Sequence, residues 1–147
     1  MRWTIVALLT LVACNDLREF QGDWRGPRVG TGVVRTGLGS ATSAALSIDR
    51  ADEHGFSARL TIDGELPETA IASLASAEAD VLAGITFSGS PLRVYLAFVG
   101  MPSAGAEALV VIALYDDRRV ELRVLRGGAQ PIYGIFALAE PPPEPLP

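Results

Sequence analysis

The stretch Arg119-Val120-Glu121-Leu122-Arg123-Val124 alternates charged and apolar side chains without a break. Successive side chains of a β-strand point to opposite faces of its sheet, so this stretch predicts a half-buried strand with its three apolar side chains on the buried face. The same period of two recurs over residues 56–62 and 132–138. The sequence therefore predicts a mainly β protein.

Short clusters of Gly, Pro, Asp and Ser interrupt these apolar runs about every 10–15 residues, the spacing that is typical of an antiparallel meander. Eight strands are enough to close a small barrel, and a β-sandwich is the alternative. We expect strands near residues 24–36, 43–50, 55–63, 81–88, 91–99, 107–115, 118–126 and 131–139.

Residues 67–79 (PETAIASLASAEA) depart from the strand pattern, because Pro67 followed by Glu68 suits a helix start and alanine favours helix. We expect one short helix here. Residues 108–114 (ALVVIAL) are apolar on both faces, so that strand requires cover on its second side. The expected helix would supply this cover.

The side chains expected inside the sheet are bulky for an eight-stranded barrel, which favours a filled interior. We expect the last strand to lie beside the first, with Phe136 pointing inward and Gly134 leaving room for Trp24. The other residues expected to point inward are Leu60, Ile62, Leu92, Leu96, Phe98 and Leu122.

The N-terminus carries a short cationic start at Arg2 and an uncharged apolar run over residues 5–13. This run is shorter than the about 20 apolar residues of a membrane span and is typical of a secretory signal. Leu11-Val12-Ala13-Cys14 resembles the lipobox of bacterial lipoproteins. That resemblance implies removal of residues 1–13 as a signal peptide and lipidation of Cys14 by acyl chains. A buried strand that happens to end in cysteine is the alternative.

The resemblance also implies a place in the cell: membrane-anchored through Cys14 in the cell envelope. Asn15 follows the cysteine, which by the sorting rule of gram-negative lipoproteins favours the periplasmic face of the outer membrane, although Asp16 weakens this inference. We expect residues 14–22 to form a tether, residues 23–139 the β-domain and residues 140–147 a Pro-rich solvated tail.

The sequence contains few side chains that could act in catalysis or bind a metal ion. All 12 basic residues are Arg, Cys14 is the only cysteine and His54 the only histidine. His54 lies in an expected turn without a partner, so the sequence indicates no catalytic set, no metal site and no cofactor. The net charge of −5 disfavours nucleic acid as a partner.

Gly22-Asp23-Trp24, just before the first long strand, resembles the opening of lipocalins. In lipocalins the tryptophan closes the floor of the barrel, so the resemblance implies a small lipocalin-like barrel with Trp24 as a candidate ligand-binding residue. For the arginine that packs over this tryptophan in lipocalins, Arg126 is the nearest candidate. We expect a non-enzymatic structural or interaction role with an envelope protein partner. The alternative is a lipocalin-like binder of a small apolar ligand.

Overall fold

The computed structural model describes residues 16–29, 43–73, 76–77, 82, 84–102, 106–126 and 132–142. The expected signal peptide, Cys14 and residues 143–147 lie outside these ranges. The described elements are a 3-10 helix, η1 (Leu17–Phe20), and the strands β1 (Gly22–Val29), β2 (Ser43–Asp52), β3 (Gly55–Ile62), β4 (Leu66–Ser73), β5 (Arg93–Met101), β6 (Ala106–Leu114), β7 (Val120–Arg126) and β8 (Ile132–Leu138).

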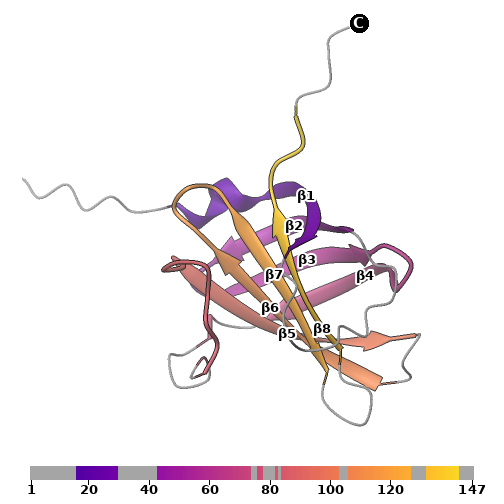
Figure 1. Cartoon of the computed structure of the whole chain (residues 1–147). Helices are drawn as coiled ribbons and strands as arrows, with labels where there is room; N and C mark the ends of the chain where they lie inside the picture. Colours follow the sequence, from indigo (N-terminus) through magenta and orange to yellow (C-terminus); the bar gives the residue numbers. More distant parts are fainter. Residues whose placement is uncertain are drawn as a thin grey trace, which may run out of the picture.

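The eight strands form one antiparallel sheet with the order β4-β3-β2-β1-β8-β7-β6-β5. The sheet curls into a nearly closed barrel, consistent with a small lipocalin-like barrel (Figure 1). β1 pairs with β2 on one side and with β8 on the other, which confirms that the first and last strands are neighbours. The remaining seam lies between β4 and β5, which adjoin without a hydrogen-bonded ladder.

The 3-10 helix η1 closes one end of the barrel. Asp16 caps it by accepting the backbone N–H of Arg18 at 3.0 Å. Leu17 and Phe20 are buried in the core, so this part of the expected tether belongs to the folded domain. We call this the η1 end; β1 leads away from it toward the opposite end.

Two expectations about secondary structure are wrong. Residues 66–73 form strand β4 instead of a helix, and Ile71 lies opposite Ala58 of β3 in the ladder. The described residues among 81–88 lie in a turn and an extended loop rather than a strand. Helix propensity is a weak preference, and the pairing with β3 outweighs the alanine content of this segment.

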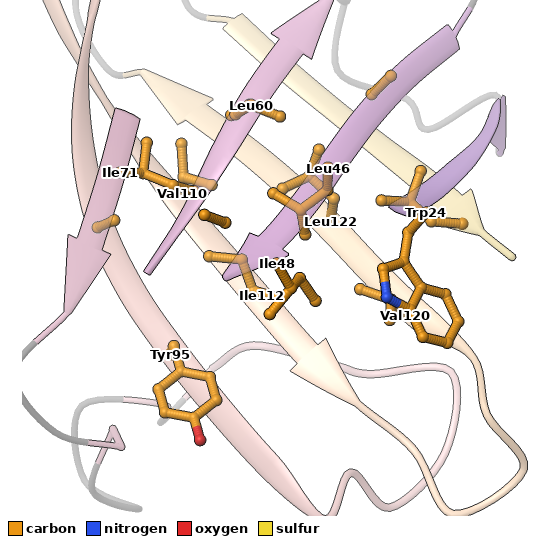
Figure 2. Packing of buried hydrophobic residues seen from close by; sticks show 14 of the residues in the cluster. Trp24, Leu46, Ile48, Leu60, Ile71, Tyr95, Val110, Ile112, Val120 and Leu122 are labelled. Carbon is orange, nitrogen blue, oxygen red and sulfur yellow. The ribbon is translucent and has the colours of Figure 1, made fainter. Parts of the chain in front are cut away.

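Large side chains fill the described interior of the barrel. In Figure 2, Leu46, Leu60, Ile112 and Leu122 meet between the two sides of the sheet. The largest fully buried side chains are Trp24, Tyr95, Tyr115, Phe56 and Phe136. Of these, all but Tyr115 belong to the interior core, which confirms the expected filled interior.

The inner face of β5 differs from the expected one. Phe98 points outward and is 70% exposed, and Leu96 packs against residues outside the barrel. The inner face is instead formed by the alternate residues Tyr95, Ala97, Val99 and Met101. Leu92 packs partly against the interior core.

Candidate functional site

Trp24 lies at the floor of the barrel and is 1% exposed (Figure 2). Its indole Nε1 donates a hydrogen bond to the carbonyl oxygen of Phe20 at 2.8 Å. The two rings stack with their centroids 5.8 Å apart. The polar atom of Trp24 is therefore already used, so the residue closes the η1 end rather than presenting a free donor to a ligand.

Arg118, and not Arg126, contacts η1 at this end of the barrel. Arg118 donates to the carbonyl oxygen of Glu19 at 3.4 Å and forms an ion pair with Glu140. Arg126 pairs with Ile132 at the other end of β7. Glu140, which the sequence assigns to the tail, is thus tied to the domain.

Gly134 does not face Trp24. The β1–β8 register sets Arg25 opposite Ala139 and Arg28 opposite Phe136, which places Trp24 level with Glu140. The glycine at the contact between the two strands is Gly26. A Cβ atom there would lie 1.7 Å from the carbonyl oxygen of Ala137.

A pocket of about 550 Å³ opens at the η1 end between η1, the β2–β3 turn and the start of β5. Five of its eight lining residues carry charge, so it suits a polar solute better than an apolar one. Below it, the Tyr95 hydroxyl donates to the carbonyl oxygen of Asp52 at 2.7 Å, and burial raises the pKa of Tyr95. The lining residues are Asp16, Leu17, Arg18, Ala51, Asp52, Glu53, Leu92 and Arg93.

His54 lies in the exposed β2–β3 turn, as expected. Its backbone N–H donates to Asp52 Oδ1 at 2.8 Å. The hydrogen bond from Arg50 is the main cause that holds the pKa of Asp52 below its ordinary value. Asp52 therefore organises the turn and is not poised as a base at neutral pH.

The outer face of β5, β6 and β7 is covered by residues 85–91, which we call the outer strap. Phe87 and Ile85 pack there against a second apolar cluster that contains Val94, Val111 and Tyr115. The sequence predicted that the doubly apolar strand at 108–114 requires such cover. The cover is an extended strap and not the expected helix.

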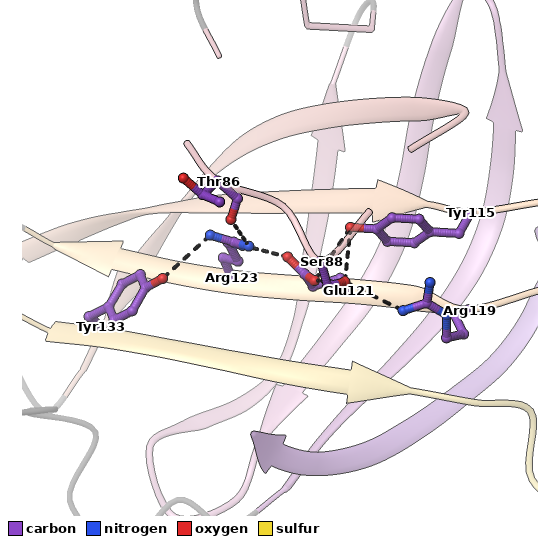
Figure 3. A network of polar contacts seen from close by, with 7 residues as sticks. All are labelled: Thr86, Ser88, Tyr115, Arg119, Glu121, Arg123 and Tyr133. Atoms are coloured by element: carbon purple, nitrogen blue, oxygen red, sulfur yellow. Dashed lines mark hydrogen bonds and ion pairs between the residues drawn. The ribbon is translucent and has the colours of Figure 1, made fainter. Parts of the chain in front are cut away.

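A buried ion pair ties the outer strap to β7 (Figure 3). Arg123 Nε contacts Glu121 Oε1 at 2.5 Å, and each side chain is 8% exposed. Ser88 Oγ donates to Glu121 Oε2 at 2.6 Å, and Arg123 Nη2 donates to the carbonyl oxygen of Thr86 at 2.5 Å. Both charges are thus paired and hydrogen-bonded, as burial demands.

Tyr115 borders this network, with its hydroxyl 3.4 Å from Glu121 Oε2. Burial is the main cause that raises the pKa of Tyr115. The guanidinium of Arg119 lies over the Tyr115 ring, 4.6 Å from its centroid. These contacts hold the outer strap in place, because the Ser88 hydroxyl donates to the Glu121 carboxylate, which is itself paired with Arg123.

Beyond the outer strap, an apolar row crosses the outside of the sheet. The ladder aligns Phe98 with Leu109, Leu109 with Leu125, and Leu125 with Tyr133. Phe98 is 70% exposed, and the other three are partly buried. We call these four residues the outer apolar row, which is a candidate interaction surface.

Sequence reasoning missed Arg28, which points into the barrel from β1. The sequence contained one indication of this: Arg28 lies four positions after Trp24 in the same strand, and alternation places side chains an even number of positions apart on the same face.

The described residues contain no group of three or more His, Cys, Asp or Glu that could hold a metal ion. Within the same ranges, no helix is long and apolar enough to cross a lipid bilayer. No protein-family model matches the chain. Neither a curated protein nor a solved structure matches it.

Proposed function

We propose that this chain is a lipid-anchored lipoprotein of the cell envelope with a non-catalytic interaction role. The observation that carries the interaction role is the contrast between the two faces of the sheet. The interior is filled by side chains such as Trp24 and Phe136, whereas Phe98 is exposed outside the barrel. A filled interior disfavours the alternative, a carrier of a small apolar ligand.

The anchoring part of the proposal rests on Leu11-Val12-Ala13-Cys14, whose resemblance to a lipobox is independent of the fold. Each buried CH₂ of an acyl chain contributes about 0.8 kcal/mol, so two or three chains hold a protein on a membrane. The chain enters the barrel at the η1 end, only a few residues after Cys14. A lipid on Cys14 would hold that end close to the bilayer.

Changing Cys14 to Ala is expected to abolish lipid attachment. In a gram-negative host, the wild-type chain is expected in the membrane fraction with an acyl mass on Cys14. The Cys14→Ala variant is expected in the soluble fraction or as the uncleaved precursor. The control variant Asn15→Gln keeps the cysteine and is expected to fractionate like wild type. A Cys14→Ala chain that is cleaved and membrane-bound would contradict the anchoring.

The interaction role predicts a partner at the outer apolar row. A photo-crosslinking amino acid in place of Phe98 is expected to give a discrete covalent adduct in intact cells. The same group in place of Ala70, which is exposed on β4, is the control and is expected to give none. Identical labelling from both positions, or no adduct from position 98, would count against this surface.

A further inference from the structure

Arg28 occupies an inward position of β1 at the end of the barrel away from η1. Alternation along β1 directs Trp24, Gly26 and Arg28 to the same face. Arg28 lies opposite Phe136, which is fully buried in the interior core. Residues directly opposite each other in an antiparallel pair share a face, so the guanidinium of Arg28 reaches into this end of the barrel.

One nitrogen of this guanidinium is buried and unpaired. Among the described residues, Arg28 Nη1 is the single buried side-chain nitrogen or oxygen without a hydrogen-bond partner. Arginine keeps its charge at all relevant pH values, so it cannot escape the cost of burial by losing a proton. In Arg123, the described arginine that is buried as a whole residue, each of the three guanidinium nitrogens has a hydrogen-bond partner.

Within the described part of the chain, no acidic side chain forms an ion pair with Arg28. The connections between β1 and β2, β5 and β6, and β7 and β8 contain no Asp or Glu in their residues 30–42, 103–105 and 127–131. In the β3–β4 turn, Asp63 accepts the hydroxyl of Ser43. Glu107 belongs to the alternate set of β6 that faces outward with Leu109.

We propose that Arg28 binds an oxyanion, a carboxylate or phosphate group, that enters at the end of the barrel opposite η1. A guanidinium presents a planar fork of N–H donors that matches two oxygens of such a group, and the bond is charge-assisted. Arg28 is partly exposed, so the site can be reached from solvent. This site does not depend on lipidation of Cys14.

Thermal unfolding of the purified full chain tests the proposal. Sodium phosphate and sodium acetate are titrated separately at constant ionic strength, and Arg28→Met is compared with Arg25→Met. Arg25 is exposed on the same strand and is the matched control. Wild type and Arg25→Met are expected to show a rise in Tm that reaches about 5 °C at ten times the Kd and continues with the logarithm of the anion concentration. Phosphate also stabilises proteins non-specifically. Binding at Arg28 is therefore measured as the difference between the rise in Tm of wild type and that of Arg28→Met.

Without added oxyanion, Arg28→Met is expected to melt above wild type, because the unpaired buried charge is gone. An equal rise in Tm for Arg28→Met and wild type, or no rise in wild type, would overturn the proposal. If Arg28→Met does not fold, Arg28→Lys carries the test, because it keeps the charge but loses the fork. We then expect Arg28→Lys to need about ten times more anion than wild type for the same rise in Tm. An unchanged anion concentration would overturn the proposal.

A third titration with decanoate distinguishes two sources of the anion. A rise in Tm at concentrations well below those needed for acetate would assign the site to the carboxylate of an amphiphile. Equal concentrations for decanoate and acetate would assign it to a small free anion. Both results require that Arg28→Met lose the response, and decanoate acting equally on that variant would overturn the proposal.

Discussion

Replacing Gly26 with Ala is expected to lower the free energy of unfolding by about 3 kcal/mol or more. An added Cβ would lie 1.7 Å from the carbonyl oxygen of Ala137, 2.7 Å from its carbonyl carbon and 2.9 Å from the Cα of Leu138. All three atoms belong to the backbone of β8, so no side-chain rotation relieves the overlap. The two strands must move apart, and their contact closes the barrel between its first and last strands.

Pro27 interrupts the hydrogen-bonded ladder between β1 and β8 beside this close contact. Arg25 and Ala139 exchange two backbone hydrogen bonds of 2.9 Å, so the next hydrogen-bonded pair of a regular ladder, two residues further on, would be Pro27 and Ala137. Proline has no N–H, so Ala137 cannot receive the bond that would continue the ladder. Its carbonyl oxygen lies instead against Gly26, where only a hydrogen atom fits.

Urea unfolding measures this effect, and Gly100→Ala is the control. Gly100 also lies in a strand, and nothing lies within 4 Å of a Cβ added there. We expect Gly100→Ala to change the free energy of unfolding by less than about 0.5 kcal/mol. A Gly26→Ala variant as stable as the Gly100→Ala variant would mean that β1 and β8 separate without cost, contrary to this account of closure.

The alternating segments of the sequence were sufficient to predict the sheet. Residues 56–62 and 119–124 place their apolar residues on one face only, and the corresponding strands β3 and β7 lie where expected. In β4, by contrast, the buried residues Leu66 and Ile71 are five positions apart. A register shift between Leu60 and Ile62 of the neighbouring strand accompanies this spacing. Such an irregularity removes the period of two, so the helix prediction rested on Pro67-Glu68 and on the alanine content.

The faces of β5 could not be assigned from the sequence, because both are apolar. Alternation separates Leu96 and Phe98 from Tyr95 and Ala97, but it does not say which set points inward. Packing decides this: Leu96 joins the apolar cluster outside the barrel against which the outer strap also packs, while Tyr95 stacks on Phe56 inside with ring centroids 4.8 Å apart. Contacts between segments distant in sequence thus determined the result.

The same reasoning applies to the candidate sites. From the sequence, Glu121 and Arg123 are interpreted as lying on the solvent-exposed face of their strand, because charged residues that alternate with apolar ones are typical of half-exposed strands. The burial of this ion pair depends on the outer strap, whose Thr86 and Ser88 are more than 30 residues away in sequence. Arg28 becomes a candidate only when the structure shows that its Nη1 is buried without a partner.

Truncating Phe136 to Ala is expected to cost about 3–5 kcal/mol of unfolding free energy, which urea denaturation would measure. Phe136 is fully buried and lies between Leu122 of β7 and Arg28 of β1 in the ladder. Its loss leaves a cavity where the last strand meets the first, and the filled core around it has limited freedom to collapse. The neighbouring residue Ala137 is exposed, so Ala137→Ser is the control and is expected to cost less than about 0.5 kcal/mol. Similar costs for the two variants would show that alternation in β8 does not separate core from surface, and the inward placement of Phe136 would then fail.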